Sequence, residues 1–288
     1  MYSKVTIVGV GLIGGSFGLA VRRSYPEARI TGVDSPETIE AAIAMGAIAD
    51  GVDSLEEAVG SADLIVLART VDGILEDLPL LGECLRGKIT VTDVGSTKAE
   101  ICRTAWGIHG KPWLFHGGHP MAGSEKTGVV HASADLFRNR PYLLCPDPAS
   151  PAPEIDRLEK FLAGLGGRVR RVDPQRHDRI VAAVSHLPQM AALGLASVLG
   201  WRSAQEPDLA DFAGPALRVM SRVAGSDFRL WKGICATNRE EIRQAIEEFR
   251  QALELMAERL EEPSLEDFFR SGNRLANIRK SADPEEGS

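Results

Sequence analysis

Cysteine is scarce in this chain of 288 residues, and its spacing excludes two classes of small protein. The four cysteines, Cys84, Cys102, Cys145 and Cys235, lie far apart and form no C-x-x-C pair. A zinc ribbon and a dense disulfide framework both need closely spaced pairs. We therefore predict reduced, mostly structural thiols and no metal site.

Long apolar runs and an excess of positive charge are also absent. No 18 consecutive residues are apolar, and the N-terminus, MYSK, leads into a strand-like segment without a signal-peptide pattern. We therefore predict a cytoplasmic protein with no membrane partner. The formal net charge of −7 argues against nucleic acid as a partner, because phosphate binding requires a basic face. A small anionic substrate is still compatible with this charge, since it responds only to its own pocket.

The composition, with 44% hydrophobic and 25% charged residues, is that of a soluble globular protein with room for one large or two ordinary domains. Between residues 4 and 172, short β-rich runs alternate with amphipathic segments such as 37–45 and 71–81. The β-rich runs are KVTIVGV, ARITGVD, ADLIVLA, KITVTDVG, WLFHGGH, RPYLLCP and GRVRRVD. This alternation predicts an α/β fold of the Rossmann type, a doubly wound and mainly parallel sheet with helices on both faces.

The character of the sequence changes after Asp173-Pro174, a pair that suits the N-cap and the first position of a helix. Almost everything that follows has a helical pattern. We therefore predict an α/β domain over residues 1–173, an all-α domain over residues 174–280 and a disordered tail over residues 281–288.

The clearest helix is predicted to open at Thr237, where T-x-x-E with Glu240 makes a capping box. Apolar residues then recur at alternating intervals of four and three: Ile242, Ile246, Phe249, Leu253, Met256 and Leu260. Such a stripe forms a continuous seam that packs either within the chain or against a second copy. We favour a homodimer through this helical half.

A glycine-rich turn near the N-terminus predicts a dinucleotide site. The motif G-x-G-x-x-G follows an apolar strand and opens an apolar helix, and Asp34 ends the next strand 20 residues after Gly14. Glycines permit a tight turn and a close approach to a pyrophosphate at a helix N-terminus. Asp34 accepts from ribose hydroxyls and repels a 2′-phosphate, which favours NAD over NADP. The predicted cofactor-binding residues are Gly9, Gly11, Leu12, Ile13, Gly14 and Asp34.

Arg69 follows the apolar run IVLA of a predicted strand, and the loop after that strand should pass near the cofactor. This side chain either contacts the pyrophosphate or an anionic substrate, or is a solvated surface cation. The sequence leaves both interpretations open, and we include Arg69 among the candidate cofactor-binding residues.

The stretch FHGGHPMAGSEKTG, residues 115–128, has no hydrophobic period and lies at the carboxyl end of a predicted strand. Open α/β sheets place their ligands at that edge. We interpret its glycines as positions where the backbone approaches a ligand. His119 is the candidate general base, because a neutral imidazole titrates near the working pH.

Five segments in order resemble the motifs of the prephenate dehydrogenase and arogenate dehydrogenase family of tyrosine biosynthesis: GVGLIGGS, DVGSTKAEI, HPMAGSEKTG, DRIVAAVSHLPQ and SRVAGSDFRLWKGICATN. The resemblance implies an NAD(P)-binding Rossmann domain joined to a helical dimerisation domain, with the active site in the cleft between them, and Asp34 favours NAD as the cofactor. It also implies oxidative decarboxylation of a cyclohexadienol. Prephenate would give 4-hydroxyphenylpyruvate, and arogenate would give tyrosine.

The same resemblance implies roles for single residues. His119 matches the catalytic histidine that bonds the substrate hydroxyl, and Ser96 matches the serine that orients it and the nicotinamide. His186 and Trp231 match residues of the substrate pocket, and Arg222 matches the arginine that holds a substrate carboxylate. Each has a structural alternative: a helix N-cap for Ser96, a core position for His186 and Trp231, and a surface cation for Arg222.

Substrate choice is less well determined by the sequence. The segment GPALRVMSR, residues 214–222, departs from the acidic and glycine-rich pattern common in that family. Glu125 is the candidate carboxylate that would favour the ammonium group of arogenate, but Lys126 adjoins it. We favour prephenate as substrate, with arogenate or dual specificity as the alternative.

A non-catalytic NAD-binding regulatory module is a remote third hypothesis. A hydroxyacid dehydrogenase would carry a lysine in its central helix, and DRIVAAVSHLPQ has none.

Overall fold

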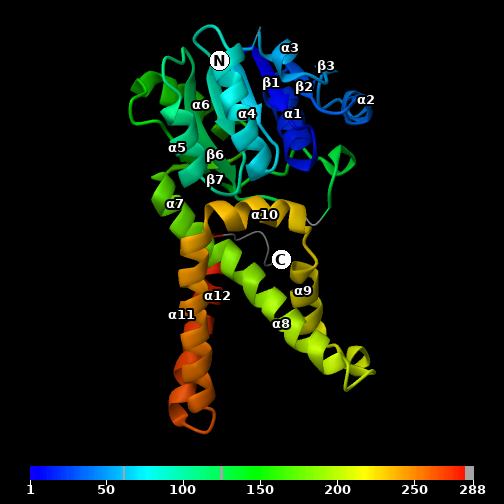
Figure 1. Ribbon diagram of the computed structural model, residues 1–288, viewed down its shortest axis with the longest axis vertical. Coiled ribbons are helices and arrows are strands. Elements are labelled where there is room, and N and C mark those ends of the chain that lie inside the picture. Colours follow the sequence, from blue (N-terminus) through cyan, green and yellow to red (C-terminus); the bar gives the residue numbers. More distant parts are fainter. Residues whose placement is uncertain (61, 124–125, 283–288) are drawn as a thin grey trace.

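The computed structural model describes residues 1–60, 62–123 and 126–282, which form an α/β part and a helical part (Figure 1). The α/β part has one sheet in the order β3-β2-β1-β4-β5-β6-β7-β8. Strands β1 to β6 run parallel to one another, β7 is antiparallel to β6, and β8 is parallel to β7. The strands are β1 Lys4–Val8, β2 Arg29–Val33, β3 Asp50–Val52, β4 Leu64–Leu67, β5 Thr90–Asp93, β6 Leu114–Pro120, β7 Pro141–Cys145 and β8 Arg168–Arg171.

Helices cover both faces of this sheet. They are α1 Leu12–Ser24, α2 Pro36–Ala44, α3 Leu55–Val59, α4 Val71–Cys84, α5 Ala99–Gly107 and α6 Ala152–Gly164, with a 3₁₀ turn at Val129–His131. One buried cluster packs α1 and α6 against the sheet, and a second packs α4 and α5 against its other face. The predicted fold class is therefore confirmed. The sequence analysis missed β3, whose three residues are only partly buried at the edge of the sheet and form no apolar run.

The helical part begins where the sequence predicted it. Asp173 is the N-cap of α7, and its side chain accepts hydrogen bonds from the backbone N–H groups of Gln175 and Arg176, both at 3.0 Å. The helices are α7 Pro174–Val181, a π-helical turn Ala182–His186, α8 Leu187–Ser203, α9 Pro215–Ala224, α10 Phe228–Thr237, α11 Arg239–Glu258 and α12 Glu266–Ala282, with 3₁₀ turns at Leu209–Phe212 and Pro263–Leu265. The first two residues of the predicted tail therefore belong to α12, and residues 283–288 lie outside the described residues.

The predicted capping box at Thr237 is wrong. Thr237 is the last residue of α10, and α11 starts at Arg239 with Asn238 in the N-cap position. The Thr237 hydroxyl donates to the carbonyl of Gly233 at 2.8 Å and lies 2.8 Å from the hydroxyl of Thr97 in the α/β part. It therefore serves the preceding helix and the contact between the two parts, so it is not available to cap α11.

The predicted stripe on α11 is largely exposed in the single chain. Ile242 is buried at its start, but Leu253 is 47% exposed and Leu260, just beyond the helix end, is 64% exposed. Figure 1 shows α8 and α11 extending away from the sheet. The helical stretch Pro174–Ser203 contains an 18-residue window with a mean hydropathy of 1.4, of which 28% is buried, and it is long and apolar enough in principle to cross a membrane. Length and composition alone are weak grounds for a membrane span. The helical part thus has apolar faces that the chain itself does not cover.

Candidate active site

The glycine turn between β1 and α1 has the geometry that its sequence predicted. Gly9 has a φ of +90°, and a side chain there would lie 2.8 Å from the carbonyl oxygen of Ala68. A Cβ on Gly14 would lie 1.9 Å from the Gly9 carbonyl oxygen, whereas one on Gly11 would meet nothing within 4 Å. Gly9 and Gly14 therefore shape the turn, and Gly11 faces open space.

The start of α1 fits an anionic group. The N-cap residue of α1 is Gly11, which has no side chain to cap the helix, and the first turn of α1 holds no acidic residue. The free N–H groups and the positive end of the helix dipole therefore suit a pyrophosphate. Asp34 lies alongside, with its Oδ2 accepting from the backbone N–H of Val10 at 2.8 Å. These residues fit the phosphates and adenosine ribose of NAD, and the assignments of Leu12 and Ile13 at the same helix start remain predictions.

Arg69 lies in the wall of a cleft of about 530 Å³ that also includes Gly9 and Asp34. Its guanidinium pairs with the carboxylate of Asp77 and lies 3.6 Å from Glu76. Burial raises the pKa of Asp77, and the charge of Arg69 opposes that rise. Arg69 is thus an ion-paired cation in the wall of the cleft whose side chain is 43% exposed, which is compatible with both interpretations from the sequence. A contact with a cofactor phosphate remains a prediction.

His119 is a buried, neutral base at the carboxyl end of β6. Its side chain is only 8% exposed, and burial lowers its pKa well below the ordinary value, with the neighbouring His177 and Lys98 adding to the effect. Its Nδ1 lies 2.9 Å from Nε2 of His177, and Nδ1 of His177 lies 2.7 Å from Oδ1 of Asp178. A neutral imidazole whose Nδ1 is hydrogen-bonded in this way can accept a proton at Nε2.

The glycines before His119 serve packing, which corrects our interpretation that they approach a ligand. A Cβ on Gly117 would lie 2.7 Å from the sulfur of Cys102, and one on Gly118 would lie 2.4 Å from the backbone oxygen of Asp93. Gly118 also donates its N–H to Oδ1 of Asp93 at 2.9 Å. The two glycines therefore let β6 lie directly against β5 and α5, which places His119 at the sheet edge.

His116 of the same stretch has a structural position. It is fully buried, and its Nδ1 accepts from the backbone N–H of Asp147 at 3.2 Å. Burial lowers its pKa to about 4. His116 bonds Asp147, whereas His119 bonds His177, so the two histidines do not form one catalytic pair.

A buried ion pair supports the loop that carries Ser96. Lys98 and Asp93 have fully buried side chains and are bonded to each other. Oδ2 of Asp93 also accepts from the backbone N–H of Gly95 at 2.8 Å. Such a pair is costly to break, because either partner alone would be a buried uncompensated charge. The loop is therefore held firmly on both sides of Ser96.

The N-cap alternative for Ser96 is wrong. The N-cap position of α5 belongs to Lys98, and the helix is capped from the helical part: the carboxylate of Asp178 accepts from the N–H groups of Lys98 at 2.7 Å and Ala99 at 2.9 Å. Ser96 is half-buried and has no hydrogen bond to the part of the chain that the structure describes. Its hydroxyl is therefore free of the helix. The catalytic role of Ser96 remains a prediction.

His186 ends the π-helical turn and is 1% exposed. Its Nδ1 lies 3.2 Å from Nδ2 of Asn238, which also donates to the backbone carbonyl of Asp178 at 2.9 Å. A carbonyl can only accept, so this amide nitrogen is a donor, and His186 must carry its proton on Nε2. Burial lowers the pKa of His186 to about 4. It is therefore a neutral imidazole that presents an N–H donor from Nε2.

Two further predicted pocket residues have different positions. Trp231 on α10 is partly buried and packs its ring edge-on to His186, with centroids 5.7 Å apart. It thus has a core contact, and its place in the substrate pocket remains a prediction. Arg222 lies in the last turn of α9 and is exposed, whereas the histidines are buried. The atypical segment 214–222 contributes most of that helix, and Glu125 lies outside the described residues.

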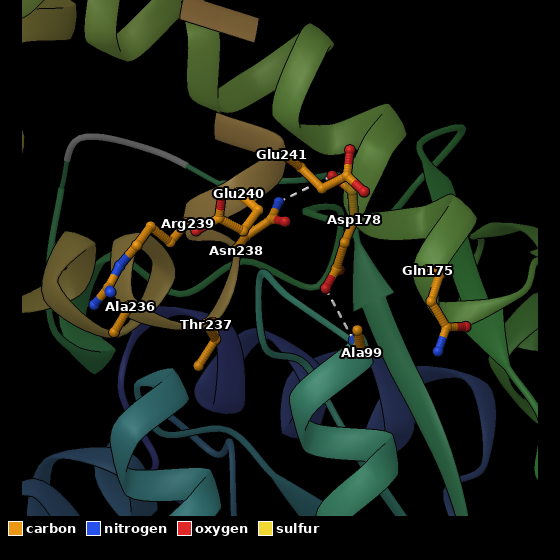
Figure 2. A pocket seen from close by; sticks show the side chains of 9 residues that line it. All are labelled: Ala99, Gln175, Asp178, Ala236, Thr237, Asn238, Arg239, Glu240 and Glu241. Carbon is orange, nitrogen blue, oxygen red and sulfur yellow. Dashed lines mark hydrogen bonds between the residues drawn. The ribbon is translucent and has the colours of Figure 1, made fainter. Parts of the chain in front are cut away.

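A cavity of about 380 Å³, lined by both polar and apolar groups, lies at the junction of α5, α7 and the α10–α11 turn (Figure 2). Asp178 lies between Ala99 and Asn238 there: its carboxylate accepts from Ala99 of the α/β part, and its backbone carbonyl accepts from Asn238 within the helical part. The cavity includes neither His119 nor the glycine turn. It marks the contact between the parts, with Asp178 at its centre.

Sequence reasoning missed His177, Asp178, Lys98, Asp93 and Asn238. The available signal was weak: a His-Asp pair in the first helix after Asp173-Pro174, and a Lys and an Asp in the motif DVGSTK. Their meaning depends on partners distant in the chain, since His119 and His177 lie 58 residues apart.

The arrangement is that of a two-domain dehydrogenase, in which a sheet holds a nucleotide and a helical domain packs on its carboxyl edge. Two family models match the chain: the nucleotide-binding domain of prephenate dehydrogenase over residues 17–171, and its dimerization domain over residues 173–272. The chain therefore belongs to the prephenate dehydrogenase family.

Individual relatives agree with this assignment. Prephenate dehydrogenase of Bacillus subtilis is 31% identical over 94% of this chain and 73% of its own length. The crystal structure of A. aeolicus prephenate dehydrogenase, in complex with hydroxyphenyl propionate and NAD+, has a TM-score of 0.88 and 32% identity and covers 96% of this chain and 98% of that chain. Synechocystis arogenate dehydrogenase has a TM-score of 0.81 and 28% identity and covers 96% of this chain and 99% of that chain.

Proposed function

We propose that this chain is an NAD-dependent dehydrogenase that oxidises prephenate with loss of CO2 to give 4-hydroxyphenylpyruvate. The observation that carries the proposal is His119, a buried neutral base at the sheet edge next to the loop of Ser96. The A. aeolicus relative binds NAD+ and hydroxyphenyl propionate, which supports the same classes of ligand for this chain.

The proton in this reaction moves between the substrate and His119. Nε2 of His119 takes the proton of the C4 hydroxyl while the C4–H bond breaks and its electron pair leaves as hydride. NAD, when bound, accepts that hydride. The bond from the ring to the departing carboxylate then breaks, its electrons make the ring aromatic, and the ring oxygen takes the proton back from His119. For this proton transfer, the site needs a base that is deprotonated at rest.

The substrate is held by charge and by a neutral donor. Prephenate is a dianion, and a guanidinium can grip one carboxylate in two-pronged geometry. We assign that role to Arg222, and we assign Nε2–H of His186 and the ring of Trp231 to the pocket. Ser96 completes the site by orienting His119 and the nicotinamide. Correct placement is a large part of catalysis when the cofactor carries the hydride chemistry.

Arogenate is the alternative substrate, and the 28% identical Synechocystis relative supports it. The two substrates differ at a keto group or an ammonium-bearing carbon, and a carboxylate such as Glu125 would favour the ammonium. We favour prephenate because Lys126 adjoins that residue in sequence.

We also propose that the protein is a cytoplasmic homodimer. The exposed apolar residues of α8 and α11, together with the apolar groove between α8 and α9, supply a surface for a second copy. The match to a dimerization domain supports this assignment. A second copy would cover the apolar stretch Pro174–Ser203 without any membrane.

The test is NADH formation by the purified chain with prephenate and arogenate, each with NAD and NADP. We expect activity with prephenate and NAD, and a loss of ~10²–10⁴-fold in kcat for His119→Ala. His109→Ala, which replaces an exposed histidine, is the matched control and should be fully active. No turnover with either substrate would contradict the proposed function.

A further inference from the structure

We propose that Asp178 is a positioning residue that determines, through His177, which nitrogen of His119 carries the proton. The inference rests on the proposed role of His119 as the base. It concerns two side chains of the helical part that, within the described residues, make no hydrogen bond to the glycine turn or to Ser96.

The hydrogen-bonding capacity of each group dictates the proton positions. A carboxylate only accepts, so His177 must donate from Nδ1 to Oδ1 of Asp178 across 2.7 Å. Burial lowers the pKa of His177, so its ring is neutral and its Nε2 is an acceptor. His119 must then donate from Nδ1 across 2.9 Å, which leaves its Nε2 unprotonated. That is the tautomer a general base requires.

Asp178 also ties this chain of bonds to the packing of the two parts. The same carboxylate accepts the N–H groups of Lys98 and Ala99 at the start of α5. Its backbone carbonyl accepts from Asn238, which contacts His186. The carboxylate is therefore held in place by the α/β part and passes that placement to His177. The correct tautomer of His119 forms only when the helical part is docked on α5.

Two single variants and their combination separate positioning from simple helix capping. Asp178→Ser keeps a capping hydroxyl for α5 but removes the acceptor for His177. His177→Phe keeps the cap bonds of Asp178 but removes the partner of His119. We expect each to lower kcat by at least about tenfold, and by less than the ~10²–10⁴-fold loss for His119→Ala. The double variant should be no slower than the slower single variant, because both changes break one chain.

The tautomer can be read directly by ¹⁵N NMR of ring-labelled histidine, with the His119 signal assigned by its absence in His119→Ala. We expect the wild-type ring to be protonated on Nδ1, and the two single variants to lose that preference. Thr237→Val, which removes a different bond between the two parts, is the control and should keep the wild-type tautomer and kcat.

Three results would overturn the inference: a wild-type His119 protonated on Nε2, a His177→Phe enzyme within threefold of wild type in kcat, or additive losses in the double variant. If His177→Phe fails to fold, Asp178→Ser and the wild-type spectrum decide the matter. An inactive wild-type chain would count against the proposed function alone, since the tautomer measurement needs no substrate.

Discussion

The carboxyl edge of the sheet and the far ends of the helical part differ in which side chains they bury. At the sheet edge, buried polar groups meet partners within the same chain, as in the bonds from His119 through His177 to Asp178. On α8 and α11, large apolar side chains remain exposed. The bonds of the first region form within a single chain, whereas the second region is where we propose a second copy. The proposed catalytic geometry and the proposed assembly therefore lie in different parts of the fold.

Breaking the buried ion pair should be the most damaging test of the first region. Lys98→Met leaves the carboxylate of Asp93 buried and unpaired, so we expect a loss of about 3–5 kcal/mol in the free energy of unfolding. Urea denaturation followed by circular dichroism measures it. Asp93→Asn combined with Lys98→Met should recover much of the loss. A single variant as stable as wild type would show that the pair contributes nothing to this region.

The buried histidines should make stability depend on pH. His116 and His186 have pKa values lowered from 6.5 to about 4. The unfolded chain therefore binds more protons than the folded chain between these values, and stability falls as the pH falls from 6.5 toward 4. Each histidine should cost on the order of 2 kcal/mol at pH 5. Unfolding at pH 7 and pH 5 measures the difference, and His116→Asn should reduce it. An equal free energy at both pH values would contradict the lowered pKa values.

A charge on the exposed seam should disturb the second region alone. Leu253→Glu places a carboxylate on α11 where we propose a partner chain, so the dimer should weaken by about tenfold or more. Sedimentation velocity measures the dissociation constant, and Gln244→Glu, on the same helix at an exposed polar position, is the control. NAD binding should be retained. A variant that stays fully dimeric would place the interface elsewhere.

The smallest effect should come from the contact between the two parts at Thr237. Thr237→Val removes the hydroxyl that lies 2.8 Å from that of Thr97. We expect a loss of about 0.5–1.5 kcal/mol in unfolding free energy, the worth of the one net hydrogen bond between the parts, because the other bond of this hydroxyl is a local one to the Gly233 carbonyl of its own helix. Thermal unfolding measures it. A larger loss would mean that the junction depends on this bond more than on Asp178.

The sequence predicted most of the fold because the signals are local. Alternating β-rich and amphipathic runs specify a doubly wound sheet, and Asp173-Pro174 specifies a helix start at residue 174. The same locality explains the failures. Thr237 has the sequence of a capping residue, yet its hydroxyl bonds Thr97, which lies 140 residues away in the sequence. The two glycines before His119 looked like ligand-facing positions, but they accommodate the backbone of Asp93 and the side chain of Cys102.

The sequence alone therefore determined the α/β class, the glycine turn with Asp34, and His119 as the candidate base, because each depends on residues close together in the chain or on a motif read in order. Tertiary structure alone decided that Asp178 caps α5, that His177 links it to His119, and that Asn238 sets the proton of His186. The first two relations join the two domains, and the third joins distant segments of the helical domain. Hydrogen-bond direction and burial arise only when those segments pack, so no local pattern encodes them.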